Sequence, residues 1–229
     1  MPPSFSAMLE RWITALHTED PGLEEPAATR DRFKERFPKN ATRRMTQLGL
    51  LVGASLEPLG LTENDTLVYA SGYAETRALE SYLDSFPGAS PTLFQTSIHP
   101  SAVQQALIVR QQAVRQFFPV TGGACLPAQA LQTALLADTP RAVLCGGEER
   151  GTWLLENNAA SDRAFAFALA LSASPAGALA RLTLTVDDNP EDNAANIRFA
   201  LADFFDVLHT RRPFDGCIAP SRRLTLAWL

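Results

Sequence analysis

The sequence has 229 residues, of which 46% are hydrophobic and 20% are charged, and its formal net charge is -5. These values are typical of a globular chain and argue against disorder or a fibrous architecture. The negative charge excludes a broad basic surface, so we expect no nucleic-acid partner. No apolar run approaches the ~20 residues that cross a bilayer, and the first residues lack the pattern of a signal peptide. We therefore expect a cytoplasmic protein without a membrane span.

The cysteines and the short motifs predict no metal and no cofactor. Cys125, Cys145 and Cys217 are far apart and form no CxxC pair, which argues against a disulfide framework and a zinc site. The glycine pairs of the chain belong to no GxGxxG motif or phosphate loop. The acidic run at 187–192 has the composition of a turn followed by a helix start.

Regular secondary-structure patterns begin after the first forty residues. Residues 1–41 mix a short apolar stretch with a polar, proline-marked segment, and we expect a surface lead-in there. Apolar residues at helical spacing within 45–59, followed by Gly60, predict a buried helix. A β-rich run at 66–72 and a helical pattern at 75–86 predict a strand, a turn and a helix.

The middle of the chain has the pattern of a parallel βαβ unit. Ser101 is suited to cap a helix that begins there. A brief strand, a double glycine and a helix follow within 119–138, and a short apolar strand ends in glycines and acids at 141–149.

The last third predicts further strands and one more helix. The runs at 163–172 and 180–186 are β-type, and we expect them to pair as antiparallel neighbours. Residues 192–209 repeat apolar positions at helical spacing, including the aromatic stripe of Phe199, Phe204 and Phe205, which we assign to the core. A strand at 223–229 follows this helix.

Four segments resemble, in the same order, a known protein family. They are TRRMTQLGLLVGASLEPLGL with LVYASGY, then FQTSIHPSAVQQALI, then TGGACLPAQALQTALL, and finally AVLCGGEER. Together they resemble the ketoacyl synthases of fatty acid and polyketide assembly, and within them the chain length factor branch. The resemblance implies an α/β fold, the N-terminal half of a thiolase fold. In that fold helices cover a mixed, largely parallel sheet and the helix after the double glycine is buried.

The resemblance implies a single domain, residues 1–229, in three parts. These are the lead-in at 1–41, the matched half at 42–186, and a C-terminal helix and strand at 187–229. Condensing enzymes of this family take catalytic histidines, or a histidine and an asparagine, from a second half of the fold. Too few residues remain here for that second half. Half of a layered fold leaves an apolar face, which its own last residues or another subunit must cover.

The resemblance places a degenerate nucleophile elbow at Gly122, Gly123, Ala124 and Cys125. One alignment puts Cys125 at the nucleophile position and the other puts Ala124 there, and the sequence leaves both open. A thiol at a helix start has its thiolate favoured by the helix dipole, but no histidine base is evident, so we expect no catalytic residue. His99 is a candidate for the pocket near the elbow, with a structural role as its alternative.

The function implied by the resemblance is that of a non-catalytic, chain length factor-like subunit. Such a subunit pairs with an active β-ketoacyl synthase as a heterodimer, meets the acyl carrier protein through that complex, and shapes the acyl tunnel. An aryl polyene or related pigment pathway is the expected setting. Two alternatives are a small acyl-transferring or thioester-hydrolysing enzyme that uses Cys125, and a module that binds acyl carriers or acyl-CoA.

Overall fold

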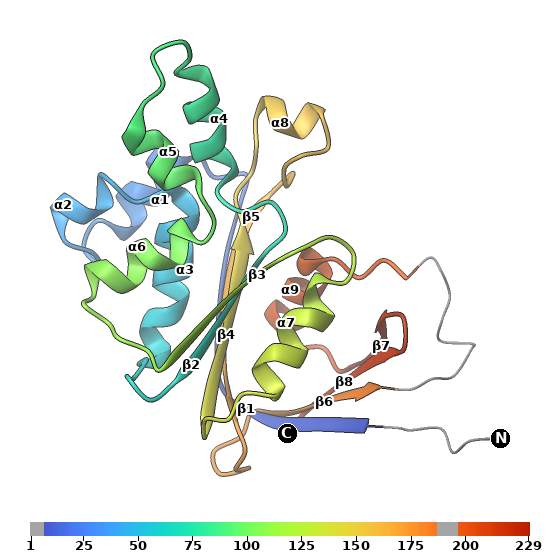
Figure 1. The fold of residues 1–229 in the computed structure, drawn as a ribbon. Coiled ribbons are helices and arrows are strands. Elements are labelled where there is room, and N and C mark those ends of the chain that lie inside the picture. The colour runs from blue at the N-terminus through green and yellow to red at the C-terminus, as the bar shows by residue number, and fades with distance from the viewer. Residues whose placement is uncertain (1–6, 187–196) are drawn as a thin grey trace.

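A computed structural model of the chain describes residues 7–186 and 197–229. Helices cover both faces of one eight-stranded sheet with the strand order β3-β2-β4-β5-β1-β6-β8-β7 (Figure 1). The strands are β1 (Ala7–Gly22), β2 (Thr66–Ser71), β3 (Gln116–Thr121), β4 (Arg141–Glu148), β5 (Ala164–Ser172), β6 (Ala180–Val186), β7 (Phe214–Ala219) and β8 (Arg222–Trp228). The helices are α1 (Pro26–Phe33), α2 (Lys39–Thr42), α3 (Gln47–Leu56), the 3-10 turn η1 (Glu57–Leu59), α4 (Thr76–Asp84), α5 (Pro91–Ser97), α6 (Ser101–Val109), α7 (Leu126–Leu135), α8 (Trp153–Glu156) and α9 (Leu201–His209).

The alternating sequence of β5 separates two hydrophobic cores, one on each face of the sheet. Its alanines pack in the core that contains α3 and α6, and its phenylalanines and leucines pack in the core that contains α7 and α9. Successive strand residues point to opposite faces, so one strand serves both cores. All ten residues of α3 are buried, because α3 lies between the sheet and the helices α1 and α6.

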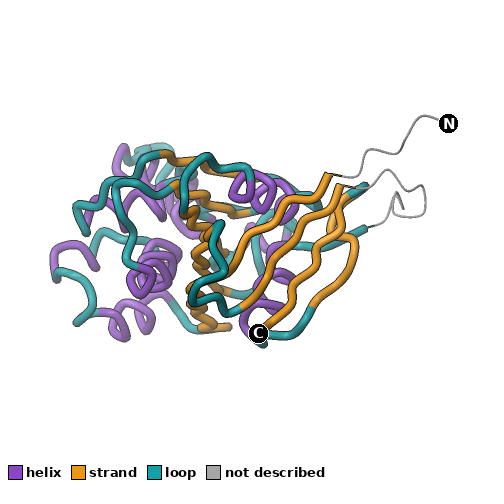
Figure 2. The backbone as a smooth tube through the Cα atoms, turned by 90° about the horizontal axis from the view of Figure 1, so that it is seen from below, coloured by secondary structure: helices purple, strands orange, loops and turns teal. Residues whose placement is uncertain are grey.

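The long first strand, β1, joins the two parts of the sheet. Residues 7–13 pair with β6, and residues 12–22 pair with β5, with register shifts in the β5 ladder. Beyond β1 the strands β6, β8 and β7 splay away from the rest of the sheet (Figure 2). The expectation of a surface lead-in at 1–41 is therefore wrong for β1, which is an interior strand of the sheet.

The sheet is mixed, as predicted, but most of its strand pairs are antiparallel. Among the described strands only the pairs β2–β3 and β2–β4 are parallel, so the expectation of a largely parallel sheet is wrong. The predicted pairing of β5 with β6 is also wrong, because β1 lies between them and pairs antiparallel with both. The second correction follows from β1, whose pairing partners lie far away in the sequence.

Elements with strong local patterns agree with the predictions. The helix before Gly60 appears as α3 and η1, and Gly60 has the left-handed φ of a helix stop. The strand, helix and βαβ unit appear as β2, α4 and β3–α7–β4, with β2 between β3 and β4. Ser101 lies inside α6 instead of capping it. The described part of the predicted helix at 192–209 forms α9 only from Leu201, and β7 was not predicted.

The last residues of the chain cover the apolar face beside α7. Phe204 and Phe205 of α9 are fully buried and pack in the same core as α7, with Phe167 and Phe165 of β5 as their ring partners. Phe199 is also buried. The assignment of the aromatic stripe to the core is confirmed, and the C-terminal segment supplies the expected cover. Within the two described ranges no helix is long and apolar enough to cross a membrane.

Arg11 of β1 ties the end of α7 to the sheet. This buried side chain donates hydrogen bonds to the carbonyl oxygens of Leu135, Ala137, Thr139 and Pro140. The last carbonyls of a helix lack partners within the helix and carry partial negative charge. Arg11 thus provides donors at the C-terminal end of α7, the helix that follows the elbow.

We predict that Arg11→Met destabilises the chain by on the order of 3 kcal/mol, because several buried carbonyls lose their donor. Arg181→Met is the matched control, since Arg181 of the adjacent β6 pairs with Trp12 and its side chain is 51% exposed. The control should change the unfolding free energy by less than about 0.5 kcal/mol. Urea unfolding at fixed pH measures the unfolding free energy of both variants. Equal decreases in this free energy would contradict the role of Arg11.

Candidate functional site

A cavity lies at the carboxyl ends of the parallel strands β2, β3 and β4. Its volume is about 880 Å³. The turn after β2, the elbow after β3 and the end of β4 form one wall, and the segments before β5 and α9 form the other. The lining residues that the following paragraphs use are Gly72, Tyr73, Gly122, Gly123, Ala124 and Glu148.

Glu148 holds the turn after β2, which forms part of one wall of this cavity. Its carboxylate accepts hydrogen bonds from the backbone N–H groups of Gly72 and Tyr73 and from the hydroxyl of Ser71. Ser71 in turn accepts a bond from the N–H of Ala74. Burial raises the pKa of Glu148 to about 7, although these three donors favour the charged form.

Three more buried glutamates, outside the cavity lining, cap helices. Glu149 accepts bonds from the N–H of Leu48 in α3 and of Arg77 in α4, so that one carboxylate joins the starts of two helices. Glu75 caps α6 and Glu80 caps α8 in the same way. Burial raises the pKa of both Glu75 and Glu149 to about 7. These carboxylates fix where the helices meet the sheet.

The elbow places Ala124 and Cys125 in different surroundings. Gly122, Gly123 and Ala124 line the cavity, whereas Cys125 is not part of the lining. Cys125 is the N-cap residue of α7 and packs, half-buried, against the core beside α7. This arrangement supports the alignment that places Ala124 at the nucleophile position.

The glycine pairs differ in what they permit. At Gly147 a Cβ would lie 2.3 Å from the carbonyl oxygen of Phe165, and at Gly146 it would lie 2.5 Å from that of Ala70. These two glycines of β4 allow the backbones of the neighbouring strands to approach closely. The elbow shows no such crowding, because a Cβ at Gly123 would meet nothing within 4 Å.

His99 does not line the cavity but lies on the opposite face of the sheet. Its ring stacks on Tyr69 with centroids 4.9 Å apart, and Tyr69 belongs to the core around α3. Burial lowers the pKa of His99 to about 4, so the ring is neutral at physiological pH. The alternative of a structural role for His99 fits this position better than a role in the cavity.

Within the described parts of the chain no group of three or more histidine, cysteine, aspartate or glutamate side chains is arranged to hold a metal ion. The acidic run at 187–192 lies outside the described residues. The features left as candidates for a functional site are the elbow, its cavity and the buried carboxylates.

The comparisons with known proteins find similarity in structure but not in sequence. No protein-family model and no curated protein matches the chain. It is similar to a chain of "Ketosynthase (ApeO) in Complex with its Chain Length Factor (ApeC)" from Xenorhabdus doucetiae, with a TM-score of 0.70 and 20% identity over 96% of this chain and 99% of that chain. The chain has a ketosynthase-like, thiolase-type fold.

A second solved structure agrees with this assignment. The ishigamide ketosynthase/chain length factor matches with a TM-score of 0.58 and 14% identity, over 82% of this chain and 70% of that chain. The predicted resemblance is confirmed for the fold. At these identities the residues of the ketosynthase-like site must be judged on the geometry of this chain alone.

Sequence reasoning missed the buried glutamates. Glu148 and Glu149 end a strand and look like the start of a polar turn, and Glu75 and Glu80 fall on a helix with many polar residues. One sequence signal indicates Glu148 and Glu149, because these two acids end an apolar strand. The carboxyl ends of parallel strands lie together, so these acids lie near the starts of the helices that follow the neighbouring strands. Helix starts attract carboxylates.

We predict that the unfolding free energy falls as the pH rises from 5 to 7. Glu75, Glu148 and Glu149 have pKa values raised from 4.5 to about 7, so the folded state binds their protons more tightly and loses stability as they ionise. The limit is ~1.4 kcal/mol per pH unit for each group. His99, with its lowered pKa, acts in the opposite direction below pH 6.5 and offsets part of this fall.

Urea unfolding at pH 5.5, 6.5 and 7.5 measures this dependence, and Glu149→Gln should make it shallower. Carboxylates paired with arginine, such as Glu57, have lowered pKa values and respond below this window. A stability that rises steadily from pH 5.5 to 7.5 would contradict the prediction.

Proposed function

We propose that this chain is a non-catalytic, chain length factor-like subunit that forms a heterodimer with an active β-ketoacyl synthase. In this complex the elbow cavity contributes to the shape of the acyl tunnel, and the acyl carrier protein meets the chain only through the complex. An aryl polyene or related pigment pathway is the proposed setting. The ketosynthase-like fold and its similarity to a chain from a ketosynthase and chain length factor complex support this proposal.

The observation that carries the proposal is the chemistry of the cavity wall. The described lining contains no cysteine and no histidine, and Ala124 lies where the elbow meets the cavity. Acyl transfer through a thioester needs a thiolate and a base that activates it. A site with the shape of the elbow but without these groups is suited to bind an acyl chain, not to react with it.

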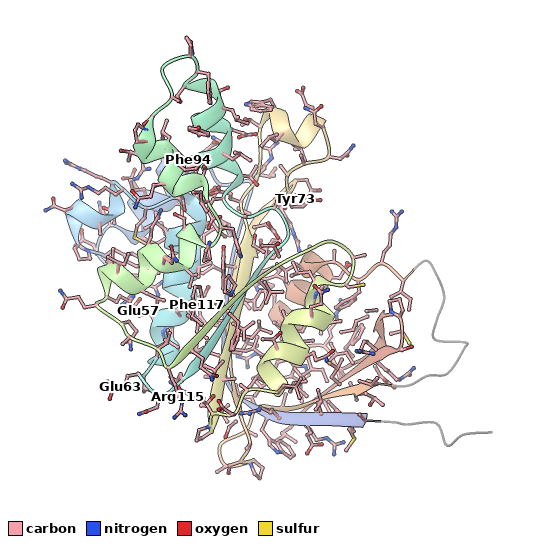
Figure 3. All side chains as sticks on the ribbon, in the orientation of Figure 1. Glu57, Glu63, Tyr73, Phe94, Arg115 and Phe117 are labelled. Carbon is pink, nitrogen blue, oxygen red and sulfur yellow. The ribbon has the colours of Figure 1, made fainter. Side chains whose placement is uncertain are left out.

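The exposed edge strand β3 supports pairing with another subunit. Among the described strands β3 pairs only with β2, and its six residues, QFFPVT, carry no charge. Proteins usually protect a free edge with charged residues, and an uncharged edge with exposed apolar side chains invites another chain. Phe118 is 40% exposed on this edge. Tyr73, Phe94 and Phe117 lie on the face of the molecule that β3 crosses (Figure 3).

We predict that Phe118→Lys lowers co-purification with the β-ketoacyl synthase from the same genome by at least about tenfold, or ~1.4 kcal/mol. The substitution places a charge on the edge that the partner would cover. Leu23→Lys is the control, because Leu23 is equally apolar and 68% exposed but follows β1, far from β3 in the strand order. Equal recovery of both variants, or a wild-type chain that binds no synthase, would overturn the proposal.

The enzymatic alternative is separated from the proposal by Cys125→Ala. We predict that a complex of the synthase with this variant elongates acyl chains at the wild-type rate, and that iodoacetamide labels wild-type Cys125 no faster than a free thiol at neutral pH. A loss of turnover by several orders of magnitude would instead assign Cys125 as a nucleophile. Activity of the isolated chain on acyl thioesters, lost in the variant, would lead to the same conclusion.

The third function, an acyl-binding module that acts without a synthase, is favoured only by the size of the cavity. Titration of the isolated chain with acyl-CoA and acyl carriers distinguishes it from the proposed subunit. Saturable binding by the chain alone, together with failure to recover a synthase, would favour the module.

A further inference from the structure

Four buried polar atoms lie near one another on the α3 face of the sheet without hydrogen-bond partners among the described residues. They are the hydroxyl of Tyr69, the Oε2 of Glu75, and both ring nitrogens of His99. Buried polar groups in folded proteins nearly always have a partner, because an unmade hydrogen bond costs about 1–3 kcal/mol. This group therefore calls for a specific interaction.

The geometry identifies that interaction. The Nδ1 of His99 lies 3.9 Å from the Oε2 of Glu75, and the side chain of Glu75 is fully buried. The other carboxylate oxygen, Oε1, accepts the N–H of Ala102 at the start of α6. A movement of about 1 Å would bring the two partnerless atoms within hydrogen-bond distance. The stacking of His99 on Tyr69 keeps its ring in this position.

The surroundings favour a neutral pair. No lysine or arginine within the described chain forms an ion pair with Glu75. The titratable groups that face it are Tyr69 from β2 and Glu149 from the end of β4, and the charge of Glu149 opposes ionisation of Glu75. The first turn of α6, SAVQ, carries no charge. An ionised Glu75 would thus be a buried negative charge without a cation.

We propose that Glu75 and His99 form a buried hydrogen bond in which protonated Glu75 donates to Nδ1 of neutral His99, and that this bond is a pH-sensitive latch for the segment 91–104. This segment comprises α5, which contains no buried residue, and the first turn of α6. The latch joins the segment to the sheet through Tyr69 and to the start of α4 through Glu75. Loss of the proton leaves a buried carboxylate without a cation, and this cost favours an open segment in which Glu75 meets water.

The latch opens in a defined pH range. Because burial raises the pKa of Glu75 to about 7, the closed segment holds this proton more tightly than the open one. Opening therefore increases as the pH rises from 4.5 to 7 and levels off above 7. His99, with its pKa lowered to about 4, stays neutral throughout this range. It accepts the hydrogen bond of Glu75 as long as that carboxyl group is protonated.

The latch also bears on partner binding, and that part rests on the proposed function. The segment carries Phe94 and Ile98, both exposed, and Phe94 lies on the face that β3 crosses (Figure 3). A synthase bound there would meet a more mobile segment at neutral pH than at pH 5.5. The latch itself is a property of the isolated chain.

Hydrogen exchange and ¹⁵N NMR of the isolated chain test the latch without any partner, so its failure is distinct from failure of the proposed function. We expect the opening constant of α5 and the first turn of α6, corrected for intrinsic exchange, to rise at least about tenfold from pH 5.5 to 7. His99 should be neutral at pH 5.5 with its proton on Nε2, and the signals of His17 and His209 serve as references.

Glu75→Gln preserves both hydrogen bonds of residue 75 but cannot ionise, so the pH dependence of opening should disappear. Glu63→Gln is the matched control at an exposed glutamate and should retain it. His99→Asn should open the segment at pH 5.5 to the extent seen in the wild type at pH 7, which tests the latch if Glu75→Gln does not fold. An unchanged pH dependence in Glu75→Gln, or a charged His99 at pH 5.5, would overturn the proposal.

Discussion

The arrangement of helices on this sheet depends on buried charges placed at helix ends. Glu149 joins the starts of α3 and α4, Glu75 and Glu80 cap α6 and α8, and Arg11 binds the carbonyl oxygen of Leu135 at the end of α7 and those of the segment that follows it. Each carboxylate lies at the positive end of a helix dipole and the arginine at a negative end. The apolar cores supply the attraction between layers, but these contacts determine where along the sheet each helix begins or ends.

The same contacts explain how the chain keeps a well-formed elbow. The turn after β2 is held by Glu148, and α7 is held at its far end by Arg11 and along its side by Phe204 and Phe205 of α9. The apolar face beside the elbow helix is therefore closed within the chain. The cavity and the β3 edge remain open, and the proposed partner surface is therefore an edge and not an uncovered core.

Local patterns in the sequence predict the elements whose formation depends on neighbouring residues. The helical spacing before Gly60, the alternation in β5 and the double glycine before α7 each predict the element that forms. β1 could not be predicted in this way, because its side chains are mostly half-buried and its ladder contains register shifts. The elbow followed from the resemblance, whereas the buried glutamates and the placement of His99 depend on pairing between distant segments.

The position of β1 has a consequence for how the chain folds. The first strand in the sequence pairs with β5 and β6, for example Trp12 with Ser172 and Arg181. During synthesis on the ribosome, most of the chain must be made before β5 or β6 exists. The backbone groups of β1 therefore stay unpaired after α3 and β2 have been synthesised. Contacts across such sequence distances slow folding and lengthen exposure to aggregation. Closing this strand into the sheet should therefore be a late and slow step of folding.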